Sequence, residues 1–156
     1  MAHSTRSGKT QAKAAAGLTG SPAHQGARIT GNAHVNDHSG PGPEVMSASS
    51  LEAEKVVNPK GETLGEIEAI MLDVRGGRIA YAVLAVGGVL GIGEKFFAIP
   101  WRSLTLDTDN KQFILDVDKE RLENAPGFDK DHWPAMADRA WATQVHTYYG
   151  TTAYWE

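Results

Sequence analysis

Six short strand-like segments follow one another between residues 52 and 117, and they constrain the fold more than any other feature of this sequence. In chain order they are "EAEKVVN", "EIEAIMLDV", "IAYAVLAVGG", "FFAIPW", "SLTLD" and "QFILDV". Turn signals such as "NPKGETLG", "RGGR" and "DTDN" separate them. Short strands that are interrupted by turns about every 8–12 residues are typical of an all-β barrel or sandwich. The sequence therefore predicts a mainly β domain.

Pro100 lies inside this strand-rich region, directly before Trp101. Proline has no N–H for a sheet ladder, and within sheets it is confined to edges, first positions and bulges. We therefore expect one strand to end at Ile99, with Pro100 at a bend and Trp101 packed inward. Small barrels need such corners between strands. Gly65 has a related structural role, because a turn before the second segment requires unusual backbone dihedrals.

Composition divides the chain into three parts. Residues 1–50 are rich in Gly, Ser, Ala, His and Pro and hold no aromatic residue, which predicts a disordered leader. Residues 51–128 form the predicted barrel domain, which ends with a short helix capped by Asp118 and stopped at Pro126-Gly127. Residues 129–156 form a helical aromatic extension, whose helix we expect to begin near Pro134. Four of its residues share one apolar face: Met136, Ala140, Trp141 and Val145.

Charge and cysteine content narrow the classes of partner. Residues 51–156 hold 11 basic and 17 acidic residues, which gives a net charge of −6. This acidic balance argues against a dedicated nucleic-acid binder, because such proteins usually have a basic face. The sequence has no cysteine and no apolar run near the ~20 residues that span a bilayer. We expect no direct insertion into a membrane, and a location in the cytoplasm.

The motifs that suggest chemistry have simpler explanations. "GVLGIG" leads into a strand rather than a helix, which indicates a connecting loop and not a phosphate site. "DTDNKQ" lacks the glycine of a calcium loop, so we interpret it as a polar hairpin turn. No metal site is expected at Asp129, Asp131 and His132, nor at the histidines of the leader: His3, His24, His34 and His38.

Two histidines, His132 and His146, have no accompanying nucleophile or oxyanion site in the sequence. We therefore expect a protein that is not an enzyme, with no catalytic residue and no cofactor.

The C-terminal aromatic residues are the best functional candidates. Half of the twelve aromatic residues lie in the last 24 positions. One interpretation is that the helix and tail fold over the barrel and bury these rings, as we expect for Trp141. The other is that some rings stay exposed as a docking or self-association surface, since Trp and Tyr are enriched in interfaces. The candidates for that surface are Trp133, Tyr148, Tyr149, Tyr154 and Trp155.

The central part of the chain, about residues 52–128, resembles the PRC-barrel domain family. The resemblance rests on Gly65 followed by "EIEAIMLD", the hairpin "RGGRIAYAVLAVGG", the run "KFFAIPWRSLTL" and the closing "DKERLENAPGF". This family takes its name from the H subunit of the photosynthetic reaction centre, and a related barrel occurs in a ribosome-maturation factor. The resemblance implies a barrel of roughly six strands that serves as a binding or assembly module without chemistry of its own.

The leading functional hypothesis is a non-catalytic module that binds a partner protein or a second copy of itself, for example as a homodimer. One alternative is an adaptor for RNA or ribosome assembly, which the kinship to the ribosome-maturation barrel suggests. Another is a surface module of a membrane complex, similar to the reaction-centre subunit. A small enzyme ranks last among these hypotheses.

Overall fold

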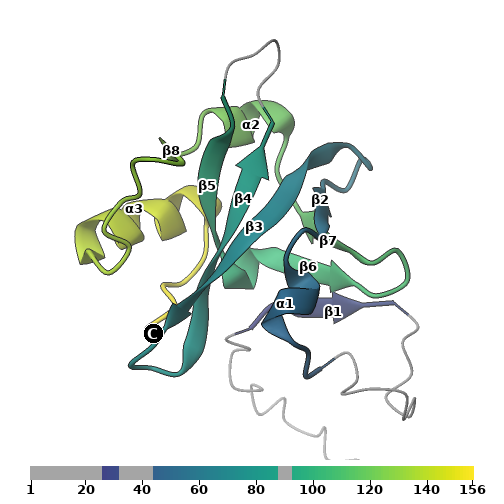
Figure 1. Ribbon diagram of the computed structural model, residues 1–156, viewed down its shortest axis with the longest axis horizontal. Helices are drawn as coiled ribbons and strands as arrows, with labels where there is room; N and C mark the ends of the chain where they lie inside the picture. Colours follow the sequence, from purple (N-terminus) through teal and green to yellow (C-terminus); the bar gives the residue numbers. More distant parts are fainter. Residues whose placement is uncertain (1–25, 32–43, 88–92) are drawn as a thin grey trace, which may run out of the picture.

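The computed structural model describes residues 26–31, 44–87 and 93–156. Within these residues the protein forms one strongly curved eight-stranded sheet, with helices beside it (Figure 1). The strands are β1 (Arg28–Thr30), β2 (Lys55–Val57), β3 (Thr63–Asp73), β4 (Arg78–Val86), β5 (Lys95–Pro100), β6 (Leu104–Asp107), β7 (Gln112–Leu115) and β8 (Gly127–Asp129). Their order in the sheet is β1-β6-β7-β2-β3-β4-β5-β8, so β1 and β8 are its two edges.

The mainly β fold is confirmed, and the six expected strands are the central six of the sheet. The sequence pattern missed the two edge strands, β1 and β8. Each has only three residues and no buried residue, so neither carries a periodic apolar signal. β1 lies within the segment 1–50, for which we expected disorder, and it pairs in parallel with β6. The rest of that segment, apart from residues 26–31 and 44–50, lies outside the described residues, as does most of "GVLGIG".

Three helices accompany the sheet: α1 (Ala48–Leu51), α2 (Lys119–Glu123) and α3 (Arg139–Tyr149). The expectation that the last helix begins near Pro134 was wrong, because α3 starts at Arg139. The Asp138 carboxylate accepts a hydrogen bond from the Ala140 N–H and caps the helix there. Gly150 ends α3 in the left-handed conformation, with φ of 66°. No helix in the described part of the chain is long and apolar enough to cross a membrane.

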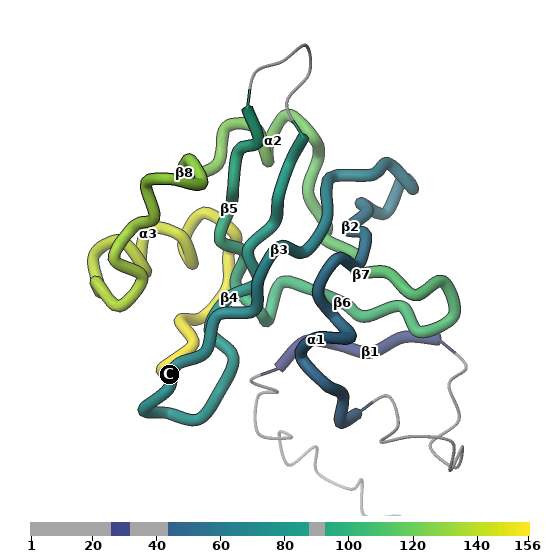
Figure 2. Tube along the Cα trace, in the orientation of Figure 1, coloured from purple at the N-terminus to yellow at the C-terminus, as the bar shows by residue number. Residues whose placement is uncertain are grey.

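Two hydrophobic cores lie on opposite faces of the sheet. The first fills its concave side and includes Val56, Leu84 and Phe113. The second lies between the outer face of β4 and β5 and helix α3, where Tyr81 and Val145 are buried. Strand β4 therefore has apolar cover on both faces, which accounts for its nearly continuous apolar sequence. Figure 2 shows the C-terminal segment running from α3 toward the tip of the β3–β4 hairpin.

The chain turns a corner after Pro100, the last residue of β5. A single 3₁₀ turn, η2 (Trp101–Ser103), links this strand to β6. The Trp101 ring packs edge-on against Phe113 of the first core, with 5.7 Å between ring centroids. The expectation that Gly65 supplies an unusual dihedral to a turn was wrong, because Gly65 lies within β3 and has no positive φ. Glycine is needed there because β3 passes close to β4, and an added Cβ would be 2.3 Å from the Ala85 carbonyl oxygen.

Candidate interaction surface

The aromatic tail, residues 151–156, packs against the second core. The Tyr154 ring meets the buried Tyr81 ring edge-on, at 5.6 Å between centroids, and the Trp155 ring lies 4.9 Å from Tyr154. Trp141 of α3 contacts Tyr81 from another side, also at 5.6 Å. Edge-to-face pairs of this kind contribute about 0.5–1.5 kcal/mol beyond the area that they bury. Trp141, Tyr154 and Trp155 are therefore partly buried parts of the second core.

Three arginines hold the tail in place. The Arg139 guanidinium lies 4.1 Å from the centroid of the Trp155 ring, and Arg78 lies 5.6 Å from that of Tyr154. Arg102 donates hydrogen bonds to the backbone oxygens of Thr152 and Glu156, at 3.4 and 3.0 Å. These contacts fix the tail to helix α3, to strand β4 and to the turn η2.

His146 lies at the centre of this packing and is only 3% exposed. Its Nδ1 is 2.7 Å from the carbonyl oxygen of Ala142, and its Nε2 accepts a hydrogen bond from the Tyr154 N–H at 3.2 Å. The first contact assigns a proton to Nδ1, and the second leaves Nε2 without one, so the ring is neutral. Burial lowers the pKa of His146; the bond to Ala142 opposes this effect and the charge of Arg102 adds to it. With both nitrogens engaged inside the protein, His146 is placed to anchor the tail.

Tyr148 and Tyr149 join the end of α3 to α2 and the first core. The Tyr148 hydroxyl donates to the carbonyl oxygen of Arg121, whose guanidinium donates to the backbone oxygen of Tyr148 and lies over its ring. Tyr149 is partly buried, and its hydroxyl has no hydrogen-bond partner among the described residues. Burial raises the pKa of Tyr149 above its ordinary value. Both rings are thus engaged within the fold.

Trp133 differs from the other four candidate residues because 42% of its surface is exposed. Its ring contacts Phe128 of β8 and Phe96 of β5, at 5.1 and 5.9 Å between centroids. Its Nε1 donates a 2.7 Å hydrogen bond to the carbonyl oxygen of Lys130. The ring is therefore held in one orientation, next to the edge strand β8, while one part of it faces solvent.

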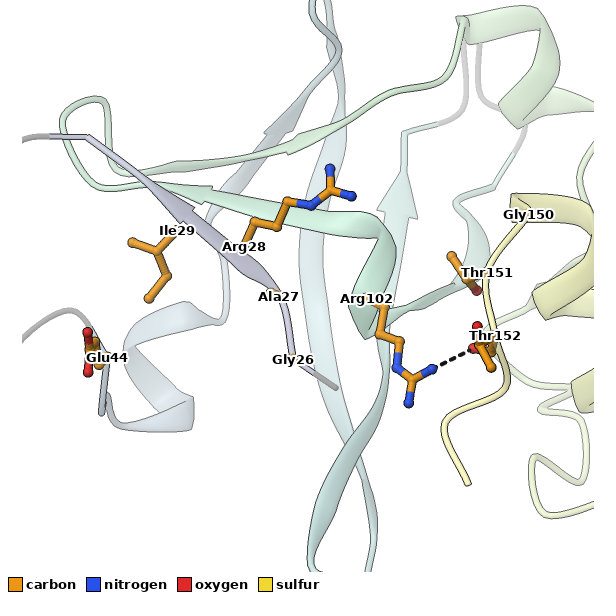
Figure 3. A pocket seen from close by; sticks show the side chains of 9 residues that line it. All are labelled: Gly26, Ala27, Arg28, Ile29, Glu44, Arg102, Gly150, Thr151 and Thr152. Carbon is orange, nitrogen blue, oxygen red and sulfur yellow. Dashed lines mark hydrogen bonds between the residues drawn. The ribbon is translucent and has the colours of Figure 1, made fainter. Parts of the chain in front are cut away.

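A cavity of about 930 Å³ opens between the β1 segment and the residues that follow α3. Figure 3 shows its walls, with residues 26–29 of the β1 segment on one side, the segment 150–152 on the other and Arg102 between them. Glu44 lines its far end. The sequence does not reveal this cavity, because three of its walls, residues 26–29, Arg102 and residues 150–152, lie more than 40 residues from one another in the chain.

The polar clusters near the turns have local structural roles. The Asp107 carboxylate accepts hydrogen bonds from the backbone N–H groups of Asp109 and Asn110, which fixes the β6–β7 turn. His132 lies 3.9 Å from Asp129, and both side chains are exposed. No group of three or more potential metal ligands occurs within residues 26–31, 44–87 and 93–156. The leader histidines lie outside the described residues.

Comparison with known proteins assigns the domain family of this chain. A search of curated proteins found no match. A crystal structure of a protein from Pseudomonas aeruginosa, described as a 16S ribosomal RNA processing protein (RimM), matches with 20% sequence identity and a TM-score of 0.34. The match covers 48% of this chain and 45% of that protein, so it spans less than half of either. The PRC-barrel domain model matches residues 43–122, half of the chain, and the protein therefore belongs to the PRC-barrel domain family.

Proposed function

We propose that this protein is a non-catalytic assembly module that docks on a protein partner through Trp133 and the adjoining edge of β8. The exposure of the fixed Trp133 ring beside an edge strand is the observation that carries the proposal. A second copy of this chain is one partner that such a surface accommodates.

The physical case rests on preorganisation. An interface anchor loses little side-chain entropy if its rotamer is already fixed in the free protein. The hydrogen bond to Lys130 and the contacts with Phe96 and Phe128 fix Trp133 in this way. Tryptophan is also among the residues most enriched in interface hot spots. The side of β8 that faces away from β5 has no neighbouring strand in the described sheet, which leaves backbone groups for a partner segment.

The other four candidates support the docking face indirectly under this proposal. Tyr148, Tyr149, Tyr154 and Trp155 hold α3 and the tail against the sheet. The proposal assigns no chemistry to His146, because both of its ring nitrogens serve as hydrogen-bonding groups inside the second core.

The test is site-specific photo-crosslinking in the native cell, with the photoreactive side chain placed at position 133. The matched control places it at Gln144, an exposed residue of α3. We expect defined crosslinked bands at position 133 that are absent at position 144. Identification of the bands separates self-association from a different protein partner. Identical patterns at the two positions, or no protein band at position 133, would contradict the proposal.

A binding assay provides the quantitative check once the partner is known. Trp133→Ala should weaken binding by at least tenfold, in line with the ~2 kcal/mol or more that hot-spot residues contribute. Unchanged binding by a folded Trp133→Ala variant would remove Trp133 from the interface.

The adaptor for RNA or ribosome assembly remains the alternative that the family kinship suggests. The net charge of −6 in residues 51–156 opposes it, because nucleic-acid affinity depends on neutralising phosphates. Retention of RNA at low salt that falls as salt is raised would favour this alternative over the proposal.

A further inference from the structure

The cavity beside β1 has a strongly cationic wall in an otherwise acidic protein. Both Arg28 and Arg102 line it, together with the threonines Thr151 and Thr152. Arg28 forms no ion pair with a carboxylate among the described residues, whereas Arg102 donates through both of its Nη groups to the backbone oxygens of Thr152 and Glu156. Glu44 lies at the far end of the same cavity. The Arg28 guanidinium and the Nε of Arg102 are therefore the cationic donors that the cavity offers to an anionic group.

The same wall has hydrogen-bond donors without acceptors. Arg102 Nε and the Thr151 hydroxyl are buried, and neither has a hydrogen-bond partner in the part of the chain that the structure describes. A buried polar group without a partner is destabilising, so an oxygen acceptor at this place is favourable. The two donors and the two positive charges call for the same kind of group, an anion with several acceptor oxygens.

β1 adds a backbone surface to the cavity. It is an edge strand, and all three of its residues are exposed. The carbonyl oxygen of Thr30 accepts a hydrogen bond from Thr108, so Thr30 directs its backbone groups toward the β6 side. Because successive residues of a strand alternate, the N–H and C=O of Ile29 face the open side. An extended peptide can add to such an edge as a further strand.

One exposed apolar side chain, Ile29, lines the cavity, and two others, Val45 and Met46, directly follow the lining residue Glu44 in the chain. Ile29 is 45% exposed, Val45 69% and Met46 40%, and Ile29 and Glu44 both line the cavity. Ile29 thus combines an exposed apolar side chain with the open edge of β1 in the described sheet and a nearby arginine, which suits a protein ligand. These features favour a peptide ligand over a nucleic acid, and the acidic charge of the domain does the same.

We propose that this cavity and the edge of β1 form a docking site for an extended, acidic peptide segment of a protein partner. One carboxylate of the peptide accepts from the Nε of Arg102 and the Thr151 hydroxyl, and a second carboxylate binds Arg28, whose side chain points away from Arg102 in Figure 3. The peptide backbone pairs with Ile29, and its apolar residues contact Ile29, Val45 and Met46. The N-terminal segment of this chain is a poor occupant, because residues 1–25 hold Arg6, Lys9 and Lys13 and no acidic residue. The site is separate from the Trp133 surface and does not depend on the function proposed there.

The test uses the full chain and an eight-residue peptide of alternating glutamate and valine with blocked ends, titrated and followed by fluorescence anisotropy. The comparison peptides replace glutamate by lysine, or carry N-methyl groups on alternate backbone amides. We expect the glutamate peptide to bind, the lysine peptide not to bind and N-methylation to weaken binding at least tenfold. Binding should also weaken as salt is raised.

Matched variants locate the site. Arg28→Gln should weaken binding of the glutamate peptide about tenfold or more, the scale of one charge-assisted hydrogen bond. The control, Arg75→Gln, removes an exposed arginine at the β3–β4 turn and should leave the affinity unchanged. Shifts in the amide NMR signals of Ile29 and Thr151 during the titration show where the peptide lies, and circular dichroism shows that each variant is folded.

Four results would overturn the proposal: no binding of the glutamate peptide to the wild-type chain, equal affinity for the lysine peptide, equal weakening by the two arginine variants, or amide shifts confined to residues outside the cavity. Binding of a short single-stranded RNA that depends on Arg28, with no binding of the glutamate peptide, would assign the site to nucleic acid instead.

Discussion

Gly65 provides the sharpest test of how β3 and β4 are packed. A Cβ at this position would lie 2.3 Å from the carbonyl oxygen of Ala85 and 3.0 Å from the Leu84 side chain. Ordinary contacts between a carbon and a carbonyl oxygen are about 3.3–3.6 Å. Gly65→Ala therefore requires β3 to move about 1 Å away from β4. Such a movement pushes it toward Val56 of β2, which pairs with Gly65 on the other side.

The size of the effect follows from these contacts. Overpacking costs about 1–3 kcal/mol, and each ladder hydrogen bond that is lost adds about 0.5–1.5 kcal/mol. We expect Gly65→Ala to lower the free energy of unfolding by about 2–4 kcal/mol. In a domain of this size such a loss lowers the Tm by roughly 10 °C or more.

Urea unfolding, followed by tryptophan fluorescence and far-UV circular dichroism, measures the change. The matched control is Gly87→Ala, because a Cβ there meets no atom within 4 Å and the residue has no positive φ. The control should leave stability unchanged or raise it by up to about 1 kcal/mol. If the two variants differ by less than about 1 kcal/mol, the inferred close approach of β3 and β4 is wrong.

Three further predictions concern the two cores. Because burial lowers the pKa of His146, the unfolded chain binds more protons than the folded chain below the ordinary histidine pKa of about 6.5. The free energy of unfolding should therefore fall as pH drops through this range; His146→Gln should lessen the fall, and an equal pH dependence in the two proteins would refute the assignment. Tyr81→Phe removes a buried hydroxyl that lacks a partner among the described residues, so stability should stay the same or rise by up to about 1 kcal/mol in urea unfolding. A loss of more than 1 kcal/mol would mean that this hydroxyl makes a hydrogen bond in solution. Phe113→Ala empties the centre of the first core, where Phe113 is 0% exposed, and should cost about 3–5 kcal/mol in the same assay; a cost below 1 kcal/mol would contradict its central place.

The sequence alone specified the six central strands and the corner at Pro100. Both follow from local rules, since strand periodicity and the missing N–H of proline act over a few residues. The nearly continuous apolar run of β4 is consistent with its cover on both faces, which α3 and the tail provide on the outer face.

The limits of sequence reasoning lie where short segments or distant residues decide the structure. Three-residue strands such as β1 and β8 have no periodic signal, and β1 exists because its backbone pairs with β6. Asp138 moved the start of α3 past Pro134, since a capping side chain outweighed a favourable first-turn residue.

The exposure of each aromatic residue was decided only by tertiary structure. Trp133 and Trp155 have the same intrinsic chemistry, but Arg139 and the second core cover Trp155, whereas Trp133 keeps an open face beside β8. The cavity at Arg28 and Arg102 arose in the same way, from segments that meet only when the sheet curves and the tail folds back. Local sequence determines whether a segment forms a strand, a helix or a turn. Burial depends on contacts between distant segments, and these exist only in the folded chain.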